Sequence, residues 1–155
     1  MRRMSDGDRF FVDTNVLLYS VDAASPEKQP AARSWVDALW ENGSGALSWQ
    51  VLHEFYVNTA RKVKIPKKVA RQLAEDFAKW RPPEVTIGLI RRAWYWSDQA
   101  QLSYWDSLIL AAAEQQECPW LLSEDFQAGR RFGHTTIVNP FLNSPDEFGL
   151  LVPKH

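Results

Sequence analysis

The chain has 155 residues, of which 45% are hydrophobic and 24% charged, and this composition is typical of one globular domain. A formal net charge of −1 excludes attraction of nucleic acid by the molecule as a whole, so such a partner would need a local basic patch. The single cysteine, Cys118, excludes an intrachain disulfide and a cysteine-based metal cluster, and it fits a reducing compartment. The first residues lack a signal-peptide core, and no apolar run approaches the roughly 20 residues of a membrane span. We therefore expect a soluble, cytoplasmic protein without membrane contacts.

The first predicted element is a strand at Phe10–Val12, because this apolar run suits a strand buried on both faces. Asp13-Thr14-Asn15 follows with residues that favour turns and helix N-caps, and a helix begins near Val16. A carboxylate at the carboxyl end of a parallel strand lies where open α/β sheets bind ligands. Taken alone, however, Asp13 is explained better as a helix cap.

A second helix is predicted from Ser25-Pro26, and residues 42–45 end it. A short strand at residues 46–47 follows, and then a helix over Trp49–Arg61 that Ser48 caps. At about 100° per residue, Glu54 falls well off the apolar stripe of that helix.

Residues 61–71 carry six positive charges and no negative charge. The run is either a solvated surface at a turn between helices or a rim that attracts phosphate. Pro66 begins the next helix, which Pro82-Pro83 ends, and residues 84–87 are predicted as a third strand.

The last third of the chain contains two more helices and two more strands. Residues 89–97 continue at helical spacing, and Ser103 caps a helix over residues 104–116. The packed face predicted for this last helix consists of Trp105, Leu108, Ile109 and Ala112. Asp106 lies in its first turn, where a carboxylate is favoured by the helix macrodipole by roughly 0.3–1 kcal/mol. Strands follow at Trp120–Leu122 and Thr135–Val138, with a loop around Arg130-Arg131 between them.

Alternating strands and helices predict an α/β domain with a mostly parallel sheet, and helix pairs between strands suggest a three-layer sandwich. Two strands end at acids, Asp13 and Asp125, and two helices carry Glu54 and Asp106 near their amino ends. Because these ends share one edge of a parallel sheet, we expect four carboxylates to converge. Their repulsion would raise some pKa values unless a cation neutralised them, and Mg²⁺ or Mn²⁺ prefers such oxygen ligands.

These residues, in this order, resemble the PIN-domain family, and more narrowly VapC-type toxins of bacterial toxin–antitoxin pairs. The matching segments are Val12-Asp13-Thr14-Asn15-Val16-Leu17, Glu54, Ser103-Tyr104-Trp105-Asp106-Ser107-Leu108-Ile109, Leu122-Ser123-Glu124-Asp125 and Ile137-Val138-Asn139-Pro140-Phe141. The resemblance implies a PIN-like three-layer α/β/α sandwich formed by a single domain over residues 1–155, with its core at about 10–141. It also implies a Mg²⁺- or Mn²⁺-dependent endoribonuclease that leaves 5′-phosphate and 3′-hydroxyl ends.

The resemblance further implies roles for individual residues. The catalytic acids are Asp13, Glu54 and Asp106, with Asp125 as a more variable fourth, and Asp13 and Asp106 are the metal ligands. Thr14 or Asn15 would orient the acids by hydrogen bonding, as would Ser123. Glu124 adjoins Asp125, and either could face the metal, although Asp125 matches the family pattern better. We further expect that the RNA backbone is held by Arg61, Lys62, Lys64, Lys67 and Lys68.

A VapC-type toxin implies a cognate VapB-like antitoxin, and we expect a homodimer. We predict that the antitoxin lies in an apolar groove around Trp35, Trp40 and Val51 and directs a basic side chain at the acids. The alternatives are a non-catalytic PIN-like module that binds RNA or protein, and a stand-alone nuclease without an antitoxin. A phosphatase is disfavoured because Asn15 stands where a second aspartate is needed. DNA-cleaving flap-nuclease relatives carry more acids and are usually much larger.

Overall fold

A five-stranded sheet with helices on both of its sides forms the framework of the computed structural model, which describes residues 8–153. The strands are β1 (Phe10–Val12), β2 (Gly45–Ala46), β3 (Trp120–Leu122), β4 (Arg131–Phe132) and β5 (Thr135–Val138). The helices are α1 (Thr14–Val21), α2 (Gln29–Asn42), α3 (Trp49–Arg61), α4 (Lys67–Ala78), α5 (Ile87–Ala100) and α6 (Tyr104–Gln115), followed by the 3₁₀ helix η1 (Pro145–Phe148). The amino-terminal residues 1–7, where the sequence predicts no signal peptide, lie outside the described residues, as do residues 154–155.

The strand order is β2-β1-β3-β5-β4, and every pairing is parallel except that of β4 with β5. Phe10 pairs with Trp120 and Val12 with Leu122, so β1 and β3 end at the same height in the sheet. The residues that follow these strands therefore meet at one edge, as expected for a parallel sheet. The predicted α/β class with a mostly parallel sheet is confirmed.

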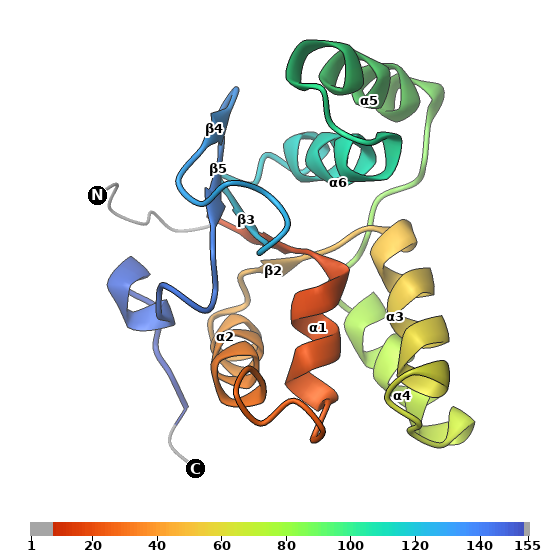
Figure 1. The fold of residues 1–155 in the computed structure, drawn as a ribbon, viewed down its shortest axis with the longest axis vertical. Coiled ribbons are helices and arrows are strands. Elements are labelled where there is room, and N and C mark those ends of the chain that lie inside the picture. Colours follow the sequence, from red (N-terminus) through yellow and green to blue (C-terminus); the bar gives the residue numbers. More distant parts are fainter. Residues whose placement is uncertain (1–7, 154–155) are drawn as a thin grey trace.

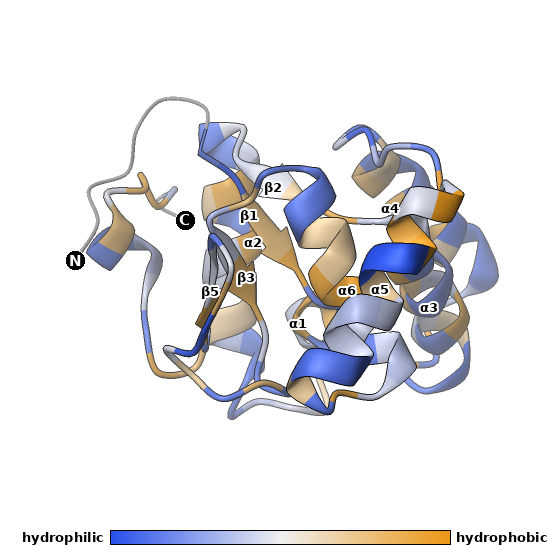
Figure 2. Ribbon diagram, turned by 90° about the horizontal axis from the view of Figure 1, so that it is seen from above, coloured by the Kyte–Doolittle hydropathy of each residue, from blue (hydrophilic) through white to orange (hydrophobic). Residues whose placement is uncertain are grey.

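The helices form two outer layers (Figure 1). Helices α5 and α6 pack against each other on one side of the sheet, and α1 packs between α2 and α3 on the other side, with α4 against α3. The central strands β1 and β3 are hydrophobic, whereas hydrophilic and hydrophobic residues alternate along the helices (Figure 2). The arrangement agrees with the three-layer α/β/α sandwich predicted from the sequence. None of the helices within residues 8–153 is both long and apolar enough to span a membrane.

Large aromatic side chains fill the core around β1. The Phe10 ring stacks on that of Trp120, with centroids 4.7 Å apart, and lies 5.5 Å from the centroid of Trp35. Trp35 is fully buried, and its indole N–H donates to the backbone oxygen of Asn143 at 2.9 Å. Phe148 of η1 contacts the same ring at 5.7 Å, so the carboxyl-terminal segment covers it.

This packing corrects the apolar surface predicted around Trp35, Trp40 and Val51. Trp35 and Val51 are fully buried, whereas Trp40 is 39% exposed. The prediction was wrong for Trp35 and Val51, because the number of aromatic residues in a sequence does not show how much of their surface other segments cover. Only Trp40 of the three can contribute to a binding surface.

Three other predictions about local structure were wrong. Residues 84–87 form no strand, because Thr86 caps α5 instead, accepting from the backbone N–H of Leu89 at 3.3 Å. Arg131 lies not in a loop but in β4, which turns back along β5 through a positive φ of 60° at Gly133. Trp105, predicted on the packed face of α6, is 63% exposed.

Candidate active site

The parallel register of β1 and β3 brings Asp13 and Ser123 together. Asp13 is 7% exposed and Ser123 is fully buried. The Ser123 hydroxyl donates to Asp13 Oδ2 at 2.8 Å, and the backbone N–H of Thr14 donates to Asp13 Oδ1, also at 2.8 Å. Asp13 therefore caps α1, as the simpler interpretation held, and at the same time presents a buried carboxylate at the ligand-binding edge of the sheet.

Asp125 is connected to Asp13 by hydrogen bonds through Ser123. The Ser123 hydroxyl oxygen accepts from the backbone N–H of Asp125 at 3.0 Å, which fixes the start of the loop after β3. Asn15 Nδ2 donates to Asp125 Oδ2 at 3.3 Å from the first turn of α1. Ser123 and Asn15 thus both hold acids in place by hydrogen bonding.

Glu54 reaches this edge from α3, the helix that packs beside α1. It lies on the exposed side of α3, away from the buried Val51 and Phe55, which agrees with its position off the apolar stripe. The hydroxyl of Thr14 donates to Glu54 Oε1 at 3.3 Å. Thr14 therefore connects Glu54 to Asp13, one residue before it in the chain.

Asp106 completes the group from the first turn of α6, and its charge contributes to the raised pKa of Asp13. Burial raises the pKa of Asp13 from 3.8 to about 7. The hydrogen bonds from Ser123 and Thr14 oppose this rise, and the charges of Asp125 and Asp106 add to it. The pKa of Asp106 is also raised by burial, against a hydrogen bond with Ser103 and with a further rise from Asp125. The structure brings the four sequence-predicted acids to one edge of the sheet, and for Asp13 and Asp106 desolvation and repulsion destabilise the charged form.

Glu124 and Asp125 are directed differently, although they are adjacent. Glu124 Oε2 accepts from Lys28 Nζ at 2.6 Å, and this lysine lies 4.8 Å from the ring centroid of Tyr19 and 5.1 Å from that of Phe141. Glu124 thus pairs with a cation just before α2, while Asp125 acts on Asp13 and Asp106. Lys28 could not be predicted as a partner of Glu124 from the sequence, since a single lysine before a helix gives no signal of a distant partner.

The donor atoms at this edge fit a hard divalent cation. They are carboxylate, hydroxyl and amide oxygens, and such oxygen ligands suit Mg²⁺ and Mn²⁺. In residues 8–153, no group of three or more His, Cys, Asp or Glu side chains is arranged to hold a metal ion unaided. Mg²⁺ usually keeps several waters and takes one or two carboxylates from the protein, so Asp13 and Asp106 are the residues that would hold it. A cation there would also relieve the repulsion that raises the pKa of both.

The basic run begins on the helix that carries Glu54. Arg61 is the last residue of α3, about two turns beyond Glu54, and α4 begins at Lys67. The five basic residues predicted to hold RNA are all exposed, and they are Arg61, Lys62, Lys64, Lys67 and Lys68. They surround the turn between α3 and α4, at the end of α3 away from the sheet (Figure 1).

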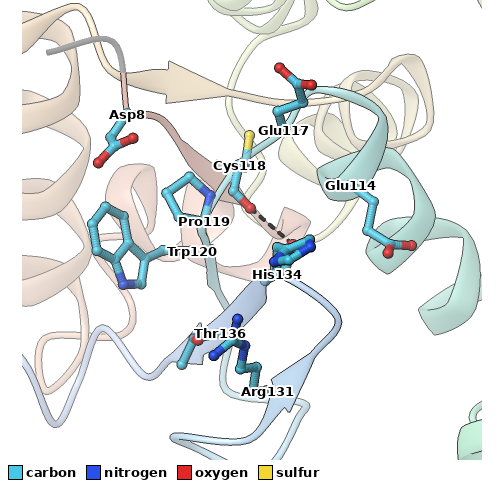
Figure 3. Close-up of a pocket in the computed structure, with 10 residues that line it drawn as sticks. Asp8, Glu114, Glu117, Cys118, Pro119, Trp120, Arg131, His134 and Thr136 are labelled. Atoms are coloured by element: carbon cyan, nitrogen blue, oxygen red, sulfur yellow. Dashed lines mark hydrogen bonds between the residues drawn. The ribbon is translucent and has the colours of Figure 1, made fainter. Parts of the chain in front are cut away.

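A separate cavity of about 660 Å³ lies at the opposite edge of the sheet, beside the amino ends of β3 and β5. Figure 3 shows Cys118 and Pro119 on one side of it and His134 and Arg131 on the other. Burial raises the pKa of Cys118 to about 12, so its thiol is not a ready nucleophile. None of the four acids lines this cavity.

Comparison with known proteins identifies the family. A search of curated proteins found no match. The sequence model of the PIN domain matches residues 10–131, from the first residue of β1 to the first residue of β4. The match covers most of the chain and includes all four acids. The chain therefore belongs to the PIN domain family.

Proposed function

We propose that this PIN-domain protein is a Mg²⁺- or Mn²⁺-dependent endoribonuclease. PIN domains are generally nucleases and usually use divalent metals. The observation that carries the proposal is the buried Asp13 carboxylate, whose pKa is raised to about 7 beside the charges of Asp125 and Asp106. A protein keeps such a destabilised group of acids where a bound cation or a reaction uses it.

In this proposal Asp13 and Asp106 hold the cation. When bound, the cation lowers the pKa of a coordinated water and polarises the phosphate group. Glu54 and Asp125 lie on the solvent side of the cluster, where a carboxylate can accept a proton from the attacking water. Thr14, Asn15 and Ser123 keep the carboxylates oriented through the hydrogen bonds described above, and attack at phosphorus leaves 5′-phosphate and 3′-hydroxyl ends.

Metal dependence is tested by incubating the purified protein with single-stranded RNA in Mg²⁺, Mn²⁺ or EDTA. We expect cleavage with either metal and none in EDTA. Asp13→Asn should abolish cleavage while the protein stays folded, because asparagine keeps the cap but loses the charge. The control Glu41→Gln removes an exposed acid at the far end of α2 and should cleave normally.

A second measurement detects metal binding independently of RNA cleavage. Mn²⁺ should raise the melting temperature of the wild-type protein and of Glu41→Gln, but not that of Asp13→Asn, because binding to the folded state alone stabilises it. Cleavage in EDTA, or by Asp13→Asn, would disprove the mechanism. RNA binding without turnover in any metal would favour the non-catalytic alternative.

The proposal includes a toxin role with a VapB-like antitoxin and a homodimeric nuclease. Its support is the VapC-like segments of the sequence together with the acidic edge, which an arginine or lysine could occupy through charge-assisted hydrogen bonds. With Trp35 and Val51 buried, a groove that the antitoxin could occupy is the one that Trp40 lines together with Leu73, Phe77, Asp76 and Lys79.

The toxin role is tested in growing cells. Expression should arrest growth, the product of a neighbouring small gene should restore it, and Asp13→Asn should be harmless. An antitoxin that lacks its carboxyl-terminal basic residue should bind but inhibit less. A monomer that cleaves RNA without arresting growth would instead be a stand-alone nuclease.

A further inference from the structure

One face of α6 is open at its first turn and covered beyond it. Trp105, Ile109 and Ala112 are spaced by four and three residues, so they lie on the same face of the helix. Ile109 is 3% exposed and Ala112 is 1% exposed, whereas Trp105 is 63% exposed. Neighbouring elements therefore cover this face from the second turn onward and leave it bare at the turn that carries Asp106.

The indole of Trp105 is supported but not covered. The ring of Tyr104, which is half-buried, meets it edge-on with centroids 5.3 Å apart and planes at 71°. Ser103 anchors the same turn by accepting from the backbone N–H of Asp106 at 3.1 Å. Trp105 is the most exposed of the large aromatic residues in the described part of the chain. A flat apolar ring is thus presented to solvent on an ordered helical turn.

The position of this ring beside the acids indicates which kind of group it can bind. Trp105 and Asp106 are consecutive in the first turn of α6, with Cα atoms about 3.8 Å apart and side chains about 100° apart around the helix, so the indole flanks the acidic edge. The face of an uncharged ring does not attract a phosphate, but it can stack on a base, and aromatic stacking is the main way in which proteins hold unpaired bases. A strand with its phosphate at Asp13 and Asp106 would have a neighbouring base within reach of Trp105.

We propose that Trp105 is the stacking platform for a base of single-stranded RNA next to the phosphate that is cut. The inference rests on the proposed function, and it adds a residue that positions the substrate of the same site. Because every base has a π face, the platform selects for single-strandedness more than for sequence. Trp105 positions the substrate and takes no part in proton transfer.

The test measures binding of labelled single-stranded RNA to full-length protein in the Asp13→Asn background, which does not turn over. Trp105→Ala should weaken binding roughly 5- to 150-fold, the range expected for loss of one stacked base. Trp105→Phe should recover most of the affinity. The control Trp94→Ala removes a 52% exposed indole from α5 and should leave binding unchanged. The salt dependence should be the same in all four proteins, because no charge differs among them.

Scanning one abasic nucleotide along the RNA identifies the contact itself. The background protein should lose affinity at one position, and Trp105→Ala should be insensitive at that position. Equal affinity of the Trp105→Ala variant, or an unchanged abasic profile, would overturn the proposal. The proposal would also be overturned if Trp105→Ala kept its RNA affinity and lost dimer formation or antitoxin binding instead. The ring would then contact a protein partner.

Failure of the stacking proposal is distinguishable from failure of the proposed nuclease. If the wild-type protein binds RNA but never cleaves it, the nuclease proposal fails and the abasic scan still decides the role of Trp105. If cleavage is normal and Trp105→Ala changes neither affinity nor abasic profile, only the stacking proposal fails. A wild-type protein that binds no RNA overturns both.

Discussion

At the scale of single residues, Asp13 combines a structural and a chemical role that the sequence presents as alternatives. Its Oδ1 caps α1 and its Oδ2 accepts from Ser123, so both carboxylate oxygens have partners although the side chain is 7% exposed. These hydrogen bonds do not fully compensate for the loss of water and for the charges of Asp106 and Asp125. The site is therefore held at the expense of stability, as expected where function requires charge.

The pH dependence of stability follows from the raised pKa of Asp13. In the folded protein this pKa is about 7, against 3.8 as the ordinary value, so between these pH values the folded state binds more protons than the unfolded state. The stability contributed by the protonated form is complete below about pH 4 and is lost as pH rises through 7. Without metal, the free energy of unfolding should fall across this window by at most roughly 4 kcal/mol on account of Asp13.

Urea denaturation in EDTA between pH 4.5 and 8.5 measures this dependence. The Asp13→Asn protein should lack this part of the fall and should be the more stable protein at pH 8, whereas Glu41→Gln should follow the wild type. If the curves of wild type and Asp13→Asn are parallel, Asp13 titrates normally and burial does not act on it as described.

At the scale of elements, the two-residue strand β2 is fitted against the end of α4. A Cβ on Gly45 would lie 2.6 Å from ring atoms of Trp80, which is too close for a real contact. The guanidinium of Arg9 donates to the backbone oxygens of Gly45 and Trp80 at 3.0 and 3.1 Å and ties the two segments together. Trp80 in turn packs against Phe77 and Trp40, so the position of its ring is determined from several sides.

Gly45→Ala should therefore destabilise the protein by about 1–3 kcal/mol, the usual cost of overpacking a filled core. The matched control is Gly88→Ala in α5, where an added Cβ meets only Thr86 Oγ1 at an ordinary 3.5 Å. There alanine should be neutral or stabilising by up to about 1 kcal/mol, because it favours the helix. Chemical denaturation of both variants checks the pair. Equal stability of the two would mean that Trp80 moves aside freely.

At the scale of the whole molecule, a chain with a net charge of −1 must attract an anionic substrate locally. In the proposed function, this patch is the basic run around the turn between α3 and α4, at the end of the helix that carries Glu54. The acidic edge repels phosphate unless a cation is bound. We therefore expect the patch to contribute affinity and the edge to contribute the reaction.

Replacing Lys62, Lys67 and Lys68 together by alanine should make RNA binding less dependent on salt. For single strands, each lost phosphate contact lowers the slope of log affinity against log salt by about 0.7, so three lost contacts lower it by about 2. A control variant with the same charge change replaces three exposed basic residues elsewhere, Arg33, Lys79 and Arg91. It should keep the wild-type slope. The same slope in both variants would assign the run to solvation.

The sequence by itself determined the α/β class, the buried strands at Phe10–Val12 and Trp120–Leu122, and the expectation of four acids at one edge. These features are local or nearly so. A short apolar run that ends at a turn residue predicts a strand end, and a parallel sheet then brings its strand ends together wherever they lie in the chain. The residues resembling a PIN domain were recognised for the same reason, since they cluster at those ends. The single-domain boundaries stay a prediction.

Only the tertiary structure decided how much of each surface is covered. Spacing put Trp105 on a packed face, and the number of aromatic residues suggested an apolar surface around Trp35, yet Trp105 is 63% exposed and Trp35 is fully buried beneath η1. It was likewise the distant Lys28 that turned Glu124 away from Asp125. Periodicity reports how side chains are arranged around their own helix or strand, because it depends on backbone geometry alone. Which partner meets them depends on segments more than 90 residues away in sequence, as with Lys28 and Glu124.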